Sequence, residues 1–153
     1  NQLYENLGAG DFTEVSDRLG PGLALSGVSR GVSMADYDSD GDVDLFVLEL
    51  NGPPRLLRND GGNAGNYLLI DTIGTRSNRD GIGTRIELEV GGLKQYAEVR
   101  SGGSYLSMND RRVHFGIGAA QRVERVELHW PSGAVQVLRD VAANQVLQVR
   151  EPE

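Results

Sequence analysis

The sequence predicts an all-β fold that is built from many short strands. Glycine accounts for 21 of the 153 residues, about twice its usual share, and it lies at turns rather than in a repeated tract. Short runs of β-branched and apolar residues alternate with these turns, and residues 119–126 are the one segment whose pattern also fits a helix. Regular alternation of short strands with turn residues is typical of β-sandwiches, barrels and propellers.

A weak internal repeat marks the first part of the chain. Residues 3–8 (LYENLG) resemble residues 56–61 (LLRNDG), and each copy has the pattern of a strand that ends in an Asn-Gly-type turn. Repeats at such a spacing indicate propeller blades or solenoid units. A glycine-rich stretch at 20–31, an acidic loop, a strand-like run and a hairpin signal at 51–52 lie between the copies. We therefore expect residues 1–62 to hold the end of one blade and the start of another.

The remaining residues, 63–153, contain further runs of strand length. These runs lie at residues 67–73, 84–90, 93–100, 113–115, 123–130, 135–138 and 146–149. The pairs Gly91-Gly92 and Ser132-Gly133 mark tight hairpins between them. So many strands in so short a span predict an antiparallel β-sandwich that follows the partial propeller-blade repeat.

Residues 36–44, DYDSDGDVD, carry the strongest chemical signal in the chain, because an aspartate stands at every second position. Two like charges about 4 Å apart repel each other by about 1 kcal/mol even in water. A loop that closes around a hard cation with a preference for oxygen ligands removes this repulsion, and Ca²⁺ fits that description best. The alternative is an acidic, solvated loop without an ion.

The spacing favours a D-x-D-x-D-G-x-x-D calcium loop over an EF-hand. An EF-hand needs a glutamate at loop position 12, which here is Val47, and a helix after the loop, where this chain has a strand-like run. Gly41 supplies the turn conformation that is costly for other residues. The expected ligands are four side chains and one main-chain carbonyl: the carboxylates of Asp36, Asp38, Asp40 and Asp44, and the carbonyl of Asp42.

Composition excludes several other classes. The formal charge is −7, and the loop holds five of the 22 acidic residues, so no basic surface for nucleic acid is expected. The chain has no cysteine, which excludes disulfides and thiolate metal sites. No apolar run reaches about 18 residues, so no membrane span is expected, and no signal peptide is visible. A rigid loop of this kind suits extracellular Ca²⁺ concentrations, which favours a secreted or cell-surface location.

Further motifs carry a resemblance to known families. They are SNRDGIG at 77–83, GSYLS at 103–107, HFGIG at 114–118, WPSG at 130–133 and ANQ at 143–145. With these motifs, residues 66–151 resemble the ASPIC/UnbV domain. Residues 1–60, with their acidic loop, resemble the FG-GAP/VCBS repeat of integrin-like β-propellers. The two occur together in the cartilage acidic protein family and its bacterial relatives, and the resemblance implies a secreted, calcium-binding, non-catalytic module.

The number of blades departs from the family pattern. Propellers commonly have four to eight blades, whereas this chain has about one and a half. Its open edges are therefore covered by the second domain or by another copy, or the chain is part of a larger propeller protein. An uncovered edge strand at residues 3–6 invites a neighbouring strand, which leads to an oligomer or a fibre.

The other polar and aromatic residues favour structural roles. Residues 78–80 have the pattern of a tight turn, with a second calcium loop as the alternative. His114 is expected to be a hydrogen-bonded packing residue, and Trp130 is expected to cover the core. An exposed Trp130 with Tyr105 or Tyr96 would instead offer a stacking surface for sugars.

No motif of an enzyme is present, because the chain lacks the GxSxG, HExxH, Walker and Rossmann patterns. We therefore expect an extracellular, calcium-binding interaction or scaffold module without catalytic activity. Its expected partner is another protein or further copies of the same chain. The alternative function is a carbohydrate-binding module that uses surface aromatic residues.

Overall fold

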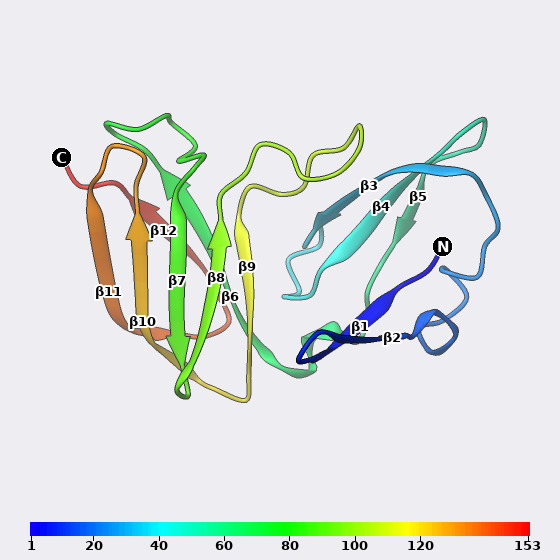
Figure 1. The fold of residues 1–153 in the computed structure, drawn as a ribbon, viewed down its shortest axis with the longest axis horizontal. Helices are drawn as coiled ribbons and strands as arrows, with labels where there is room; N and C mark the ends of the chain where they lie inside the picture. The colour runs from blue at the N-terminus through cyan, green and yellow to red at the C-terminus, as the bar shows by residue number, and fades with distance from the viewer.

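The computed structural model describes residues 1–153, except for the side chain of residue 63, and it is all-β as expected. Figure 1 shows two groups of strands side by side, here called the N-terminal lobe (β1–β5) and the C-terminal lobe (β6–β12). The helices in the described chain are two short 3-10 turns, η1 (Ser16–Arg18) and η2 (Gly62–Ala64). Neither has the length or hydropathy of a membrane-spanning helix.

The N-terminal lobe contains two antiparallel sheets. β1 (Tyr4–Gly8) and β2 (Asp11–Glu14) form a hairpin, while β3 (Ser29–Ala35), β4 (Asp44–Glu49) and β5 (Arg55–Leu57) form a three-stranded sheet. β4 is the β-branched, apolar run that follows the acidic loop, so the loop joins two neighbouring strands of one sheet.

The internal repeat corresponds to a shared turn chemistry. In the first copy the side-chain oxygen of Asn6 accepts a hydrogen bond from the backbone N–H of Gly8, at 2.9 Å. In the second copy the side-chain oxygen of Asn59 accepts hydrogen bonds from the N–H groups of Gly61 and Gly62, at 3.3 and 3.1 Å. An asparagine in each copy therefore closes the turn that ends the strand, which explains the repeated Asn-x-Gly pattern.

Every strand expected in the C-terminal lobe is present. In chain order they are β6 (Asn66–Ile73), β7 (Arg85–Val90), β8 (Leu93–Glu98), β9 (Val113–Gly118), β10 (Arg122–His129), β11 (Val135–Ala142) and β12 (Gln145–Arg150). They form two sheets with the orders β11-β10-β7-β8 and β12-β6-β9. The ambiguous segment 119–126 is a turn followed by the start of β10.

One strand pair differs from a purely antiparallel sandwich. β12 runs parallel to β6, whereas the other pairs are antiparallel. The tight turn after β11 crosses to the other sheet at Asn144, which has a positive φ of 56°. There the N–H of Asn144 donates to the carbonyl of Tyr67 at 2.7 Å, and its side-chain oxygen accepts from the N–H of Tyr67 at 3.1 Å. Asn144 thus sets the direction and register of β12.

Alternating apolar residues of the two sheets fill the core of the C-terminal lobe. Its central side chains are those of Leu68, Ile70, Ile86, Leu88, Val126 and Leu128, each at most 1% exposed. Full burial of such a side chain contributes about 1.5–3 kcal/mol. By contrast, Val15 and Val47, 7% and 6% exposed, are the only buried hydrophobic residues among the described side chains of residues 1–62. The N-terminal lobe therefore has almost no apolar core of its own.

A buried carboxylate fastens the end of β12 to the loop after β6. One oxygen of Glu151 accepts hydrogen bonds from the backbone N–H groups of Thr75, Arg76 and Ser77, at 2.7–2.8 Å. The other accepts from the hydroxyls of Ser77 and Ser132. Burial raises the pKa of Glu151, but the hydrogen bonds from Ser132, Ser77 and Thr75 outweigh it and hold the pKa well below its usual value.

We expect Glu151 to make folding stability depend on pH. Because its pKa in the folded state is lowered from 4.5, its contribution is fully present above that pH and is lost as the pH falls further. Glu151→Gln should lower the free energy of unfolding by about 3 kcal/mol at neutral pH, since it leaves buried N–H groups without a charged acceptor. It should also flatten the dependence of stability on pH below about 4.5. Urea unfolding across this range measures both effects, with Glu153→Gln at the exposed terminus as the control. Equal pH slopes in the two variants would contradict this role.

Candidate metal centre

Three aspartates of the β3–β4 loop gather around one point. One carboxylate oxygen from each of Asp36, Asp38 and Asp40 lies within 4.8 Å of the others, and no other such group occurs among the described residues. Ca²⁺ binds oxygen at about 2.4 Å, so ligands on opposite sides of one ion are about 4.8 Å apart. The three carboxylates therefore fit around a single cation of this size.

Asp36 is the buried centre of the loop. Its two carboxylate oxygens accept hydrogen bonds from the N–H groups of Asp40 and Gly41, at 3.1 and 3.2 Å. The N–H of Asp42 in turn donates to the carboxylate of Asp40 at 3.2 Å. A carboxylate oxygen has two lone pairs, so each of these oxygens keeps the capacity to bind a cation. The backbone thus folds around the carboxylates and orients them.

The charges in the loop are concentrated enough to perturb one another. Desolvation by surrounding atoms, followed by the negative charges of Asp40 and Asp44, raises the pKa of Asp38. Asp38 itself is exposed. Desolvation and the neighbouring negative charges both disfavour the ionised form of Asp38, and a bound cation would offset both.

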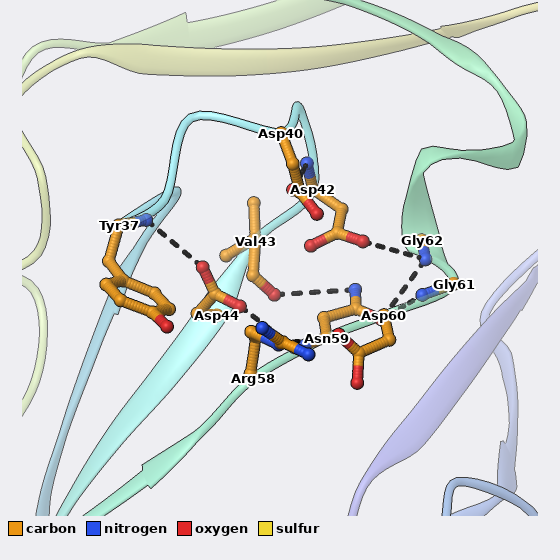
Figure 2. A network of polar contacts seen from close by, with 10 residues as sticks. All are labelled: Tyr37, Asp40, Asp42, Val43, Asp44, Arg58, Asn59, Asp60, Gly61 and Gly62. Atoms are coloured by element: carbon orange, nitrogen blue, oxygen red, sulfur yellow. Dashed lines mark hydrogen bonds and ion pairs between the residues drawn. The ribbon is translucent and has the colours of Figure 1, made fainter.

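Asp42 and Asp44 are buried and face the segment that leads to the C-terminal lobe. Figure 2 shows the carboxylate of Asp44 between the N–H of Tyr37, at 3.1 Å, and the N–H of Asn59, at 2.8 Å. The carboxylate of Asp42 accepts from the N–H of Gly62 at 3.0 Å. The structure therefore brings Asp36, Asp38 and Asp40 together and uses Asp42 and Asp44 to hold residues 59–62.

Three residues of the C-terminal lobe also support the loop. The ring of Tyr67 covers Gly41, where a Cβ atom would lie 2.2 Å from a ring carbon of the tyrosine. His114 stacks on Tyr67, with ring centroids 5.7 Å apart, and its Nε2 lies 2.9 Å from the carbonyl oxygen of Gly41. The guanidinium of Arg112 donates to the carbonyl of Asp36 at 3.2 Å. His114 is therefore a hydrogen-bonded packing residue, as expected from the sequence.

Models of two protein families match separate parts of the chain. The model for ASPIC and UnbV matches residues 74–153, just over half of the chain. The chain belongs to the ASPIC and UnbV family. The model for the FG-GAP-like repeat matches residues 1–47, which include β3, the whole acidic loop and most of β4. Both resemblances inferred from the sequence motifs are thereby confirmed.

Relatives of this ASPIC and UnbV chain include three vertebrate proteins. Cartilage acidic protein 1 of Mus musculus is 28% identical over 162 residues, which covers 100% of this chain and 25% of the relative. The Homo sapiens protein of the same name is 29% identical over 161 residues, which covers 99% of this chain and 24% of the relative. The Xenopus tropicalis protein of that name is 38% identical over 56 residues, which covers 37% of this chain and 8% of the relative. The chain thus spans about a quarter of the length of the first two relatives.

The other candidates within the ASPIC/UnbV match have structural roles. The side chain of Asn78 bonds to both the N–H and the carbonyl of Ile82, at 2.8 and 2.7 Å, and so closes a tight turn. Asp80 forms an ion pair with Arg111. Trp130 is 3% exposed and covers the core, so a sugar-stacking surface cannot include its indole and is left with Tyr96 and Tyr105.

Sequence patterns did not reveal Asn59, Tyr67 and Arg112 as parts of the site. Asn59 was visible only as a turn signal in the internal repeat, and its N–H bond to Asp44 depends on the fold. Tyr67 and Arg112 are distant from the loop in sequence and reach it only because the two lobes meet there.

We expect Gly41→Ala to be more destabilising than a glycine substitution with the same backbone strain. Gly41 has a φ of 101° and Gly10 a φ of 91°, but a Cβ atom at Gly10 meets nothing within 4 Å. Gly10→Ala should therefore lower the free energy of unfolding by about 1 kcal/mol. Gly41→Ala should lower it by about 3 kcal/mol, because the added methyl group also overlaps the ring of Tyr67. Urea unfolding without calcium measures both, and equal losses would show that Tyr67 does not cover the loop.

Proposed function

We propose that this chain is an extracellular, calcium-binding, non-catalytic interaction module. The observation that carries the proposal is the gathering of Asp36, Asp38 and Asp40 within 4.8 Å on an FG-GAP-like loop. Asp44 is the fourth proposed side-chain ligand, and Asp42 contributes its carbonyl. A bound Ca²⁺ supplies the positive charge that offsets the repulsion among these carboxylates.

The proposed role of the ion is structural. The N-terminal lobe has almost no buried apolar residues, so its sheets depend on other interactions. The loop joins β3 to β4, and its residues Asp42 and Asp44 hold the 59–62 segment. An ion that binds only the folded loop at 100 times its Kd adds about 2.7 kcal/mol to stability. Such a contribution is large for a lobe with so small a core.

The relatives support an extracellular location. They are named for cartilage, a tissue rich in extracellular matrix, and for acidity, and this chain carries a formal charge of −7. Extracellular calcium modules bind with Kd values of about 10⁻⁴–10⁻³ M, which suits a loop whose ligand Asp38 is exposed. The absence of enzyme motifs, and the structural hydrogen bonds of His114 and Glu151, support a non-catalytic role.

The proposed interaction surface is the open edge of the N-terminal hairpin. All five residues of β1 are exposed, and its one strand partner among the described residues is β2. Tyr4, Leu7 and Phe12 leave more than half of their surface exposed. A two-stranded hairpin is marginally stable alone, and an exposed apolar edge readily accepts another strand. The partner is a β-strand of another protein or of a second copy.

Calcium binding is tested with Asp38→Asn, which removes one charge without changing the side-chain shape. We expect calorimetric titration of the chelator-stripped protein to show about one ion per chain, and Asp38→Asn to weaken it at least tenfold. In chelator the variant should melt slightly higher than wild type, because it relieves repulsion. Asp17→Asn, at an exposed aspartate in η1, is the control. Absence of saturable heat for the wild type would refute the calcium proposal.

The hairpin surface is tested by light scattering over a range of protein concentrations. We expect the wild type to associate, and the double variant Tyr4→Lys with Leu7→Lys to remain monomeric, because lysine blocks strand addition at an edge. The matched control places lysine at Tyr96 and Leu93, a tyrosine–leucine pair on β8 that is even more exposed. A monomeric wild type would exclude self-association and leave a different protein as the partner.

A further inference from the structure

The proposed calcium loop lies where the two lobes meet. Figure 1 shows the connection between β3 and β4 on the side of the N-terminal lobe that faces β9. Three side chains of the C-terminal lobe contact its backbone there: Tyr67 of β6, Arg112 just before β9, and His114 of β9. The two hydrogen bonds go to backbone carbonyls, and none of the three residues belongs to the carboxylate cluster of the loop.

Two of these contacts hold the peptide units that position the carboxylates. The carbonyl of Gly41 accepts a hydrogen bond from Nε2–H of His114, at 2.9 Å. The other end of that same peptide unit is the N–H of Asp42, which donates to the carboxylate of Asp40 at 3.2 Å. His114 therefore orients and polarises the very peptide group that holds a proposed ligand.

Arg112 has the same relation to a second ligand. Its guanidinium donates to the carbonyl of Asp36 at 3.2 Å, and the N–H of that peptide unit, from Tyr37, donates to the carboxylate of Asp44 at 3.1 Å. Asp110 fixes the guanidinium, with 2.7 Å between Nε and the Asp110 carboxylate. Each relay thus runs from a side chain of the C-terminal lobe, through one peptide group, to a carboxylate of the loop.

Tyr67 completes the arrangement by packing. Its ring covers Gly41 so closely that no side chain fits at this position, and it stacks on the imidazole with an angle of 9° between the ring planes. The stack fixes the plane of the His114 ring and so directs Nε2 toward the Gly41 carbonyl.

Separate hydrogen bonds hold the two lobes together near the loop. The N–H of Asp110 donates to the carbonyl of Met34 at 2.9 Å, and the N–H of Met34 donates to the side chain of Asn109 at 3.1 Å. The segment before β9 therefore lies along the end of β3, and it brings Arg112 to the loop independently of any ion.

We propose that Tyr67, Arg112 and His114 are positioning residues of the calcium site, so that both lobes build one site. The inference rests on the proposed calcium binding by the loop, and it adds that the C-terminal lobe sets the affinity. Because coupling between two binding events is reciprocal, the ion strengthens the contact between the lobes as much as that contact strengthens ion binding.

The test measures Ca²⁺ affinity by calorimetry in variants of the full chain. His114→Phe keeps an aromatic ring on Tyr67 but removes the Nε2–H donor, and Arg112→Met removes the guanidinium while keeping the aliphatic stem. Each should raise the Kd for Ca²⁺ about tenfold, the usual effect of losing a residue that orients a metal ligand. His114→Gln, whose amide N–H replaces Nε2–H, should restore the Kd to within about threefold of wild type.

The chain contains two histidines, which allows a matched control and a spectroscopic readout. His129 pairs with Glu127 on β10, so His129→Phe should leave the Kd unchanged. In proton NMR at constant pH, Ca²⁺ should shift the ring signals of His114 and leave those of His129 in place. A purely structural role for His114 would lower the melting temperature in chelator without either effect.

The outcomes separate this inference from the calcium proposal. A wild-type protein that binds Ca²⁺, with an unchanged Kd in both His114→Phe and Arg112→Met, would overturn the inference and leave the calcium proposal standing. A wild-type protein that binds no Ca²⁺ would refute both. Should His114→Phe fail to fold, Arg112→Met and the NMR signals of wild-type His114 still decide the question.

Discussion

The repulsion among carboxylates in the β3–β4 loop is the constraint on which the N-terminal lobe depends. Asp36, Asp38 and Asp40 present oxygens within 4.8 Å of one another, and desolvation together with the charges of Asp40 and Asp44 raises the pKa of Asp38. This lobe has almost no buried apolar side chains with which to offset such a cost. Its backbone therefore surrounds the carboxylates with N–H donors, and their geometry leaves room for a cation.

The two lobes solve the same electrostatic problem in different ways. In the C-terminal lobe the carboxylate of Glu151 is fully satisfied by three backbone N–H groups and two hydroxyls, and it lies beside a well-packed core. In the loop the carboxylates of Asp36, Asp38 and Asp40 also accept backbone hydrogen bonds, but they lie close enough to repel one another. The first arrangement offsets a buried charge with hydrogen bonds, whereas the cation that we propose for the second would link its stability to ion binding.

The strands of the C-terminal lobe were predictable because apolar alternation and turn residues are local signals. The parallel pairing of β12 with β6 was not, since it depends on Asn144 meeting Tyr67 across the sandwich. The spacing of the aspartates likewise predicted a cluster, and Asp36, Asp38 and Asp40 form it. The anchoring of Asp42 and Asp44 to residues 59–62 was hidden, because aspartate spacing carries no information about which N–H groups the fold brings near.

The position of the loop between the lobes has a mechanical consequence. The end of β3 is already tied to the segment before β9 through Met34, Asn109 and Asp110, so the contact exists without an ion. The peptide groups that His114 and Arg112 orient are the same ones that hold Asp40 and Asp44. Any force that separates the lobes must therefore disturb the carboxylates, and any ion that fixes the carboxylates resists that separation. A chain with one well-packed lobe and one poorly packed lobe gains most from a charge site at this place, because there the stable lobe supports the other.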